Sequence, residues 1–236
     1  ICASLLGVTL VLKKYSMIGD GLSHIGYGAL SIGAVLNLAP LKIALPAVII
    51  SAFILLRLNE NSKLHGDSAI ALFSTTALAT GILVSSKAGL TNDVSQYMFG
   101  SILAMSKEDV IISVVMSVIV ILAFIFLYNR IFAVTFDENF AKATGVNSGM
   151  YNMIFAVLTA VTVVLGMMMM GSLLISSLIV IPTLTAMRVC RSFRGVVITS
   201  AIISVISFLI GMFTALLMNT TPGASIVIVN AIFFVI

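Results

Sequence analysis

The sequence predicts an all-α protein that crosses a membrane about eight to nine times. Hydrophobic residues make up 61% of the 236 residues and charged residues only 8%, against about 25% in soluble proteins. The mean hydropathy is +1.25. The uncharged runs are long enough for membrane helices, which need about 20 apolar residues. A chain of this composition cannot cover a water-exposed surface, which excludes a soluble enzyme and a secreted disulfide scaffold.

The first part of the chain predicts five helices. We expect residues 1–12 to be the end of a first helix that starts upstream, because they lack the basic segment and cleavage site of a signal peptide. Single crossings are expected for four further apolar runs, 17–37, 43–56, 68–86 and 110–129.

Two longer uncharged runs predict two helices each. Residues 143–187 are too long for one crossing, so we expect a break between Gly166 and Gly171. Residues 195–236 are divided by the turn-forming sequence at 219–223. We interpret the whole chain, residues 1–236, as a single transmembrane domain.

Positive charges predict the orientation of these helices. Alternating crossings place nine of the twelve Lys and Arg residues on one side, which the positive-inside rule makes cytoplasmic: Lys13, Lys14, Arg57, Lys63, Arg130, Lys142, Arg188, Arg191 and Arg194. Residues 91–106 then lie between two helices that both end on the outer side. We interpret them as a short interfacial or re-entrant helix. A true crossing is the alternative, and the charge distribution argues against it.

Two ionisable residues interrupt one of the apolar runs. Asp20 and His24 are four residues apart and share one helix face. The pattern allows a helix cap, an Asp–His hydrogen bond that fixes helix packing, or a cation site facing a cavity. A carboxylate and a neutral imidazole suit zinc and manganese, and iron less selectively. Two ligands form a weak site that can release its ion, and a twofold dimer would supply four.

A second feature is the segment 136–145 on the cytoplasmic side, which predicts a short amphipathic helix. The two phenylalanines are four residues apart and are expected to stack on one face, and the acidic residues at the start match the helix dipole. The glycine suits the position just beyond a helix end. The helix could lie on lipid or dock into a soluble partner, and its acidic residues disfavour an anionic lipid surface. The candidate docking residues are Phe136, Asp137, Glu138, Phe140, Ala141 and Gly145.

Four motifs resemble those of the permease subunits of bacterial zinc and manganese ABC importers. They are Gly-Asp-x-Leu-Ser-His at 19–24, Phe-Gly-Ser-Ile-Leu-Ala at 99–104, Phe-Asp-Glu-x-x-Ala-Lys-Ala-x-Gly at 136–145 and Gly-Ser-Leu-Leu-Ile-x-x-Leu-Ile-Val-Ile-Pro-x-x-Thr-Ala at 171–186. The resemblance covers essentially the whole chain. It implies a fold similar to vitamin B12 and siderophore importer permeases. It also implies a homodimer that works with two ATPase subunits and an extracellular metal-binding lipoprotein.

The resemblance also implies roles for individual residues. Asp20 and His24 match the family's intramembrane Asp-x-x-x-His, which is implied to contact the metal. Residues 136–145 match the coupling helix that enters a cleft of the ATPase. Pro182 matches a position that is expected to break a moving helix. Zinc is favoured over manganese because the sequence at 221–223 looks more like that of zinc-type members.

The function expected from these features is a permease that imports a divalent metal through a bacterial cytoplasmic membrane. ATP hydrolysis belongs to a separate subunit, because the chain has no Gly-x-x-x-x-Gly-Lys-[Ser/Thr] motif. We expect no permanently bound cofactor, and no nucleic-acid partner, since the Lys and Arg residues form no basic patch. The alternative is an ion-coupled secondary transporter that uses Asp20 and His24. An intramembrane hydrolase would need more ionisable groups, and Met167–Met170 suit core packing better than metal binding.

Overall fold

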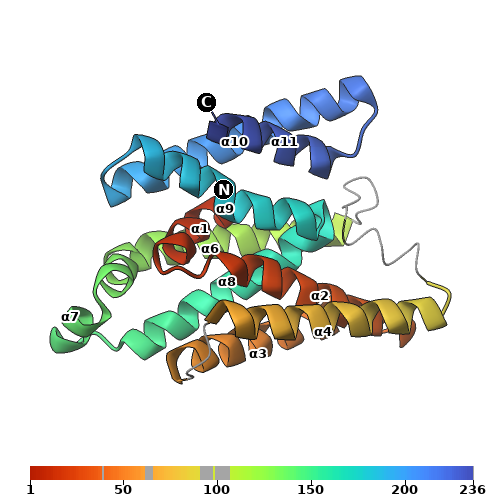
Figure 1. Cartoon of the computed structure of the whole chain (residues 1–236), viewed down its shortest axis with the longest axis horizontal. Coiled ribbons are helices and arrows are strands. Elements are labelled where there is room, and N and C mark those ends of the chain that lie inside the picture. The colour runs from red at the N-terminus through yellow and green to blue at the C-terminus, as the bar shows by residue number, and fades with distance from the viewer. Residues whose placement is uncertain (39, 62–65, 91–97, 99–106, 236) are drawn as a thin grey trace.

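The structure is a computed structural model that describes residues 1–38, 40–61, 66–90, 98 and 107–235. Within these residues the chain forms ten helices and no strand (Figure 1), which confirms the predicted all-α class. The helices are α1 (Cys2–Leu12), α2 (Ser16–Val35), α3 (Pro40–Asn61), α4 (Gly66–Lys87), α6 (Lys107–Phe136), α7 (Glu138–Ala143), α8 (Ser148–Met170), α9 (Ser172–Val189), α10 (Phe193–Met218) and α11 (Pro222–Val235).

Most of these helices have the length and composition of membrane spans. In the part of the chain that the structure describes, five segments qualify outright: Ser68–Lys87, Val110–Phe136, Ser148–Met170, Ser172–Val189 and Phe193–Met218. Three shorter apolar helices accompany them: Cys2–Leu12, Leu41–Leu55 and Pro222–Val235. Helix α2 belongs to neither group, because its Gly, Ser, Asp and His residues lower its hydropathy. Together these helices agree with the predicted eight to nine crossings.

Successive long helices run in alternating directions through the bundle (Figure 1). Helices α1, α3 and α9 end on the same side as α7, at the left of the view, and helices α2, α8 and α10 end on the opposite side. This alternation is the one that the charge distribution predicts. Helix α4 ends and α6 begins on the same side, as the positive-inside rule also requires. The prediction for 91–106 itself concerns residues outside the described part, apart from Met98.

The boundaries between helices follow local backbone chemistry. Gly171 has a φ of +87° and separates α8 from α9, within the predicted interval. Asn219 ends α10 in the left-handed conformation, and Pro222 starts α11. Pro182 lies inside α9, which continues to Val189, so the expected interruption of the helix at this proline is not found. Helix α6 extends beyond the predicted 110–129, past Arg130 to Phe136.

Helix α2 occupies the interior of the bundle. It packs against α3, α4, α8 and α9, and thirteen of its 20 residues are buried. Small residues allow the close approach, because a Cβ on Gly81 of α4 would lie 2.8 Å from the Cα of Gly28 on α2. Met167 of α8 is fully buried, and a Cβ on Gly26 of α2 would lie 2.7 Å from its terminal methyl carbon. This methionine therefore packs the core, as expected. The helix that carries Asp20 and His24 is thus largely enclosed by its neighbours.

Candidate functional site

Asp20 and His24 lie together in the first half of α2. One helical turn separates them, and Nε2 of His24 is 3.4 Å from Oδ2 of Asp20. The Asp20 side chain is 50% exposed and the His24 side chain is 23% exposed, so the pair reaches the surface of the chain from an otherwise buried helix. Helix α2 begins at Ser16, and its N-cap residue Tyr15 makes no side-chain cap hydrogen bond. Asp20 is therefore not a helix cap, and the interpretations that remain are a packing contact and a cation site.

The geometry of this pair fits a shared cation. At 3.4 Å the two atoms form a long hydrogen bond or ion pair, which is the packing interpretation, and the same separation also suits two ligands of one ion. Two ligand atoms bound at about 2.0–2.1 Å to a tetrahedral ion lie about 3.3–3.4 Å apart. The other ring nitrogen of His24, Nδ1, is buried without a hydrogen-bond partner among the described residues. A metal-bound histidine usually donates this second N–H to another group, and no described residue of this chain provides that group.

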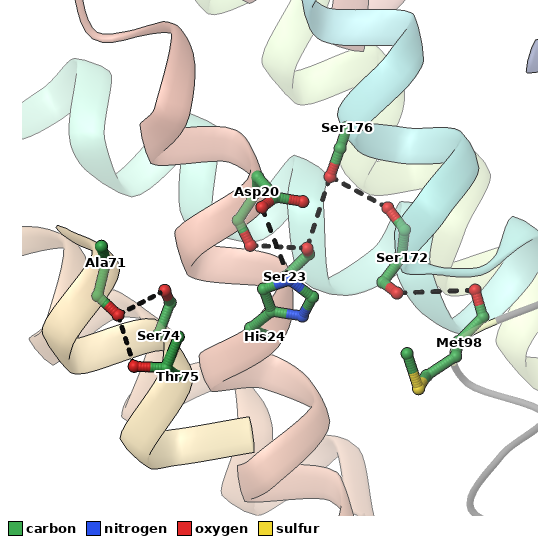
Figure 2. A network of polar contacts seen from close by, with 9 residues as sticks. All are labelled: Asp20, Ser23, His24, Ala71, Ser74, Thr75, Met98, Ser172 and Ser176. Carbon is green, nitrogen blue, oxygen red and sulfur yellow. Dashed lines mark hydrogen bonds and ion pairs between the residues drawn. The ribbon is translucent and has the colours of Figure 1, made fainter. Parts of the chain in front are cut away.

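Hydroxyl groups from two helices surround the pair, as Figure 2 shows. Ser23 Oγ donates to the backbone carbonyl of Asp20 at 2.8 Å and lies 3.4 Å from Oγ of Ser176 on α9. Ser176 Oγ donates to the carbonyl of Ser172 at 3.0 Å and also interacts with the Asp20 carboxylate. Ser172 Oγ donates to the carbonyl of Met98 at 3.4 Å. Sequence analysis did not identify the α9 serines, because isolated serines in an apolar helix give no signal of their partners.

No third strong ligand joins the pair among the residues that the structure describes. In the described ranges, no three or more His, Cys, Asp and Glu side chains are grouped closely enough to hold a metal. A cavity of about 410 Å³ among the described residues lies elsewhere, between α1, α6, α8, α9 and α10. Its described lining includes Val120, Leu165 and Phe208, and no Asp, Glu, His, Lys or Arg. Asp20 and His24 therefore remain the candidate cation ligands.

The predicted docking helix corresponds to α7, which is shorter than expected. Asp137 is its N-cap residue, with extended backbone (φ −147°, ψ 98°), and its side chain accepts a hydrogen bond from the Phe140 amide at 2.9 Å. An aspartate in this position satisfies one of the free N–H groups at a helix start. The helix itself begins at Glu138 and ends at Ala143.

Phe136 belongs to α6 and not to the docking helix. Its ring packs against Phe132, with ring centroids 4.9 Å apart, and edge-on against Phe193 at 5.9 Å. The expectation that Phe136 and Phe140 stack on one helix face is therefore wrong, because the extended residue Asp137 separates their helices. Phe140 remains 63% exposed.

The end of α7 is fixed by its own sequence. Gly145 has a φ of +81°, as expected for a residue just beyond a helix. The Gly145 amide donates to the Lys142 carbonyl at 3.1 Å, and the Val146 amide donates to the Ala141 carbonyl at 2.9 Å. These two bonds form a Schellman motif, and Val146 and Ala141 are buried together with Val134 beneath it. Helix α7 is thus a short helix that packs on an apolar cluster through its buried side.

Glu138 links α7 to the start of α8. Its Oε1 accepts a hydrogen bond from Ser148 at the start of α8 and pairs with Lys142, each at 3.0 Å. Burial acts to raise the pKa of Glu138, but the interactions with Lys142 and Ser148 outweigh it and hold the pKa below its usual value. Lys13, the C-cap residue of α1, also acts electrostatically on Glu138 and donates a hydrogen bond to Asn152 of α8. Helix α7, the start of α8 and the end of α1 are therefore linked by polar contacts.

Comparisons with known proteins agree with this arrangement. The ABC 3 transport family model matches residues 1–236. The high-affinity zinc uptake system membrane protein ZnuB of Haemophilus influenzae is 29% identical over 232 residues, which cover 98% of this chain and 89% of that protein. The manganese import system permease protein ScaB of Streptococcus gordonii is 25% identical over 236 residues and is covered to 85%. The structure of PsaBC from Streptococcus pneumoniae in complex with Fab superposes with a TM-score of 0.88 at 27% identity, covering 100% of this chain and 85% of that one.

Proposed function

This chain belongs to the ABC 3 transport family, and we propose that its cargo is a divalent transition metal ion bound at Asp20 and His24. It is a multi-pass permease subunit of an ABC importer, and a transport component rather than an enzyme. This membership argues against the ion-coupled secondary transporter. Zinc is the favoured cargo and manganese the next, and the cytoplasmic membrane of a bacterium is where the chain works.

The observation that carries the cargo proposal is the separation of 3.4 Å between His24 Nε2 and Asp20 Oδ2. This distance suits two ligands of one tetrahedral ion, which is the geometry that zinc prefers. Similar proteins are named for zinc and for manganese uptake. A nitrogen and a carboxylate oxygen bind both ions, so the preference for zinc rests on the resemblance of residues 221–223 to zinc-type members.

The proposed assembly follows from the small number of metal ligands that one chain provides. Two ligands from one chain leave an ion incompletely coordinated, so we propose a homodimer in which two copies of Asp20 and His24 share the ion. Helix α7 is the proposed docking site for a cytosolic ATPase, through exposed Phe140 and the αL residue Gly145. An extracellular metal-binding lipoprotein would deliver the ion from the opposite side.

The test is metal-dependent ATPase activity of the permease reconstituted in vesicles with its ATPase and binding protein. Zinc, manganese and iron are compared at equal free concentrations, with uptake of each metal measured in parallel. We expect stimulation and uptake in the order zinc, manganese, iron. Stimulation that is equal with and without any metal, together with no uptake, would overturn the cargo proposal. A manganese-first order would overturn only the preference for zinc.

A further inference from the structure

Helix α9 brings a line of hydroxyl groups to the face of α2 that carries Asp20. Ser172 and Ser176 are one helical turn apart, directly after the break at Gly171. Ser176 Oγ lies 3.4 Å from Ser23 Oγ and also interacts with the Asp20 carboxylate. Figure 2 shows the side chain of Ser176 extending from α9 toward Asp20 and Ser23.

The hydrogen bonds of these serines determine where their oxygen lone pairs point. A hydroxyl has one proton to donate and two lone pairs. The Ser176 proton has a near acceptor in the Ser172 carbonyl at 3.0 Å, and the Ser23 proton has one in the Asp20 carbonyl at 2.8 Å. The Ser176 hydroxyl has a second acceptor in the Asp20 carboxylate. When its proton stays on the Ser172 carbonyl, its lone pairs and the carboxylate oxygens are free to bind one cation. Such a group of oxygens is stabilised by a cation between them.

We propose that Ser176 is the ligand that α9 contributes to the cation site, so that the bound ion bridges α2 and α9. Each chain then offers a carboxylate oxygen, an imidazole nitrogen and a hydroxyl oxygen. The inference deepens the proposed function and rests on cation binding by Asp20 and His24. It also explains how the pair can hold the ion on two helices although no third His, Cys, Asp or Glu of the described residues is grouped with it.

A cysteine scan tests the position of Ser176 directly. In a background with Cys2→Ser and Cys190→Ser, Ser176→Cys introduces a single thiol at the proposed ligand. The probe is Cd²⁺, added to the purified permease–ATPase complex, and the readout is the ultraviolet charge-transfer absorption of a cadmium–thiolate bond. The matched control is Ser172→Cys, one turn away, where the hydroxyl faces the Met98 carbonyl.

We expect a saturable cadmium–thiolate band for Ser176→Cys and none above background for Ser172→Cys. No band at position 176, or bands of equal strength at both positions, would overturn the inference. A second arm keeps it testable if the cysteine variants assemble poorly. Ser176→Ala should lower zinc affinity by about 10-fold or more, within the range for ligand-supporting groups, whereas Ser176→Thr keeps the hydroxyl and should retain it. Unchanged affinity in Ser176→Ala would contradict the inference.

Asp20→Asn separates this inference from the proposed function. If Asp20→Asn loses zinc binding while Ser176→Ala binds like the unmodified protein, only the third ligand is refuted. If Asp20→Asn binds zinc normally, the site itself lies elsewhere and both proposals fail. Pull-down of the ATPase, measured on every variant, shows that the complex is assembled.

Discussion

Gly28 of α2 and Gly81 of α4 bring two helix backbones into contact. A Cβ at position 81 would lie 2.8 Å from the Cα of Gly28, and a Cβ at position 28 would lie 2.5 Å from the carbonyl oxygen of Ala77. Helix packing in lipid depends on such close approach, because the bilayer supplies no hydrophobic drive for helices to associate. The helix that carries Asp20 and His24 is thus held against α4 by backbone contact.

This contact predicts a stability effect. Gly81→Val should lower the thermal unfolding temperature, because overpacking a close contact costs about 1–3 kcal/mol. The measurement is loss of helical circular dichroism on heating in detergent. Gly149→Ala is the matched control, since a Cβ there meets only the Asn147 side chain at 3.6 Å. Equal unfolding temperatures for the two variants would show that α2 and α4 are not closely packed.

Removal of the charge at Asp20 should separate transport from assembly. Asp20→Asn keeps the size of the side chain but leaves an amide, which is a much weaker ligand. We expect loss of metal-stimulated ATPase activity and uptake. ATPase pull-down and helical content should stay unchanged, because the capping hydrogen bonds of α7 do not involve Asp20. His24→Gln should give the same result. A variant with full uptake would exclude that residue as a ligand.

Substitutions at Gly145 should act through backbone strain, because the chain leaves space for a side chain there. Its φ is +81°, and nothing lies within 4 Å of a Cβ built there. A β-branched residue in this conformation is strained by about 1–2 kcal/mol, so Gly145→Val should reduce ATPase pull-down and uptake while the chain still inserts. Gly145→Asn tolerates the conformation and should bind better than Gly145→Val. Full pull-down and uptake in Gly145→Val would show that α7 is not the docking helix.

The junction of α7 and α8 should depend on pH through Glu138. The pKa of this carboxyl is lowered from its usual value, since its interactions with Lys142 and Ser148 outweigh the effect of burial. A carboxyl with a lowered pKa contributes stability above its unfolded value and loses it as the pH falls through the folded value. We therefore expect amide-exchange protection of residues 138–146 to hold at neutral pH and fall only below about pH 4.3. Glu138→Gln should remove this pH step, and a step that persists in it would have another origin.

A shared ion predicts how mixed dimers behave. If each ion needs both copies of Asp20, only dimers of two unmodified subunits transport. An equal mixture with Asp20→Asn subunits should then retain about a quarter of the activity, as random pairing in a twofold dimer requires. The measurement is uptake by vesicles with defined subunit ratios. Activity that falls in proportion to the fraction of altered subunits would mean that each chain has its own site.

Several features were predictable because they depend on residues close in sequence. The spacing of Asp20 and His24 fixes their common helix face, and Gly171 and Asn219, both with positive φ, mark helix ends. The positions of Lys and Arg predict the alternation of the helices. These features need no knowledge of which helices are neighbours.

The features that sequence analysis missed have two physical causes. The spacing of Phe136 and Phe140 suggests one helix, but Asp137 caps a new helix between them, and an aspartate there is itself a signal for a helix start. Arg130 does not end α6, since a charged side chain can extend toward the polar end of a helix. The contact of Ser176 with α2 depends on the packing of helices that are far apart in sequence, and no local pattern encodes it.

The enclosed position of α2 has a consequence for how the protein is made. A segment with an aspartate, a histidine and many glycines partitions poorly into lipid alone. Its close backbone contact at Gly28 is with α4, which is synthesised only after α3. We therefore expect α2 to enter the bilayer together with later helices. A nascent chain that stops before α4 should leave α2 accessible to water-soluble labelling reagents, and one that extends through α4 should protect it.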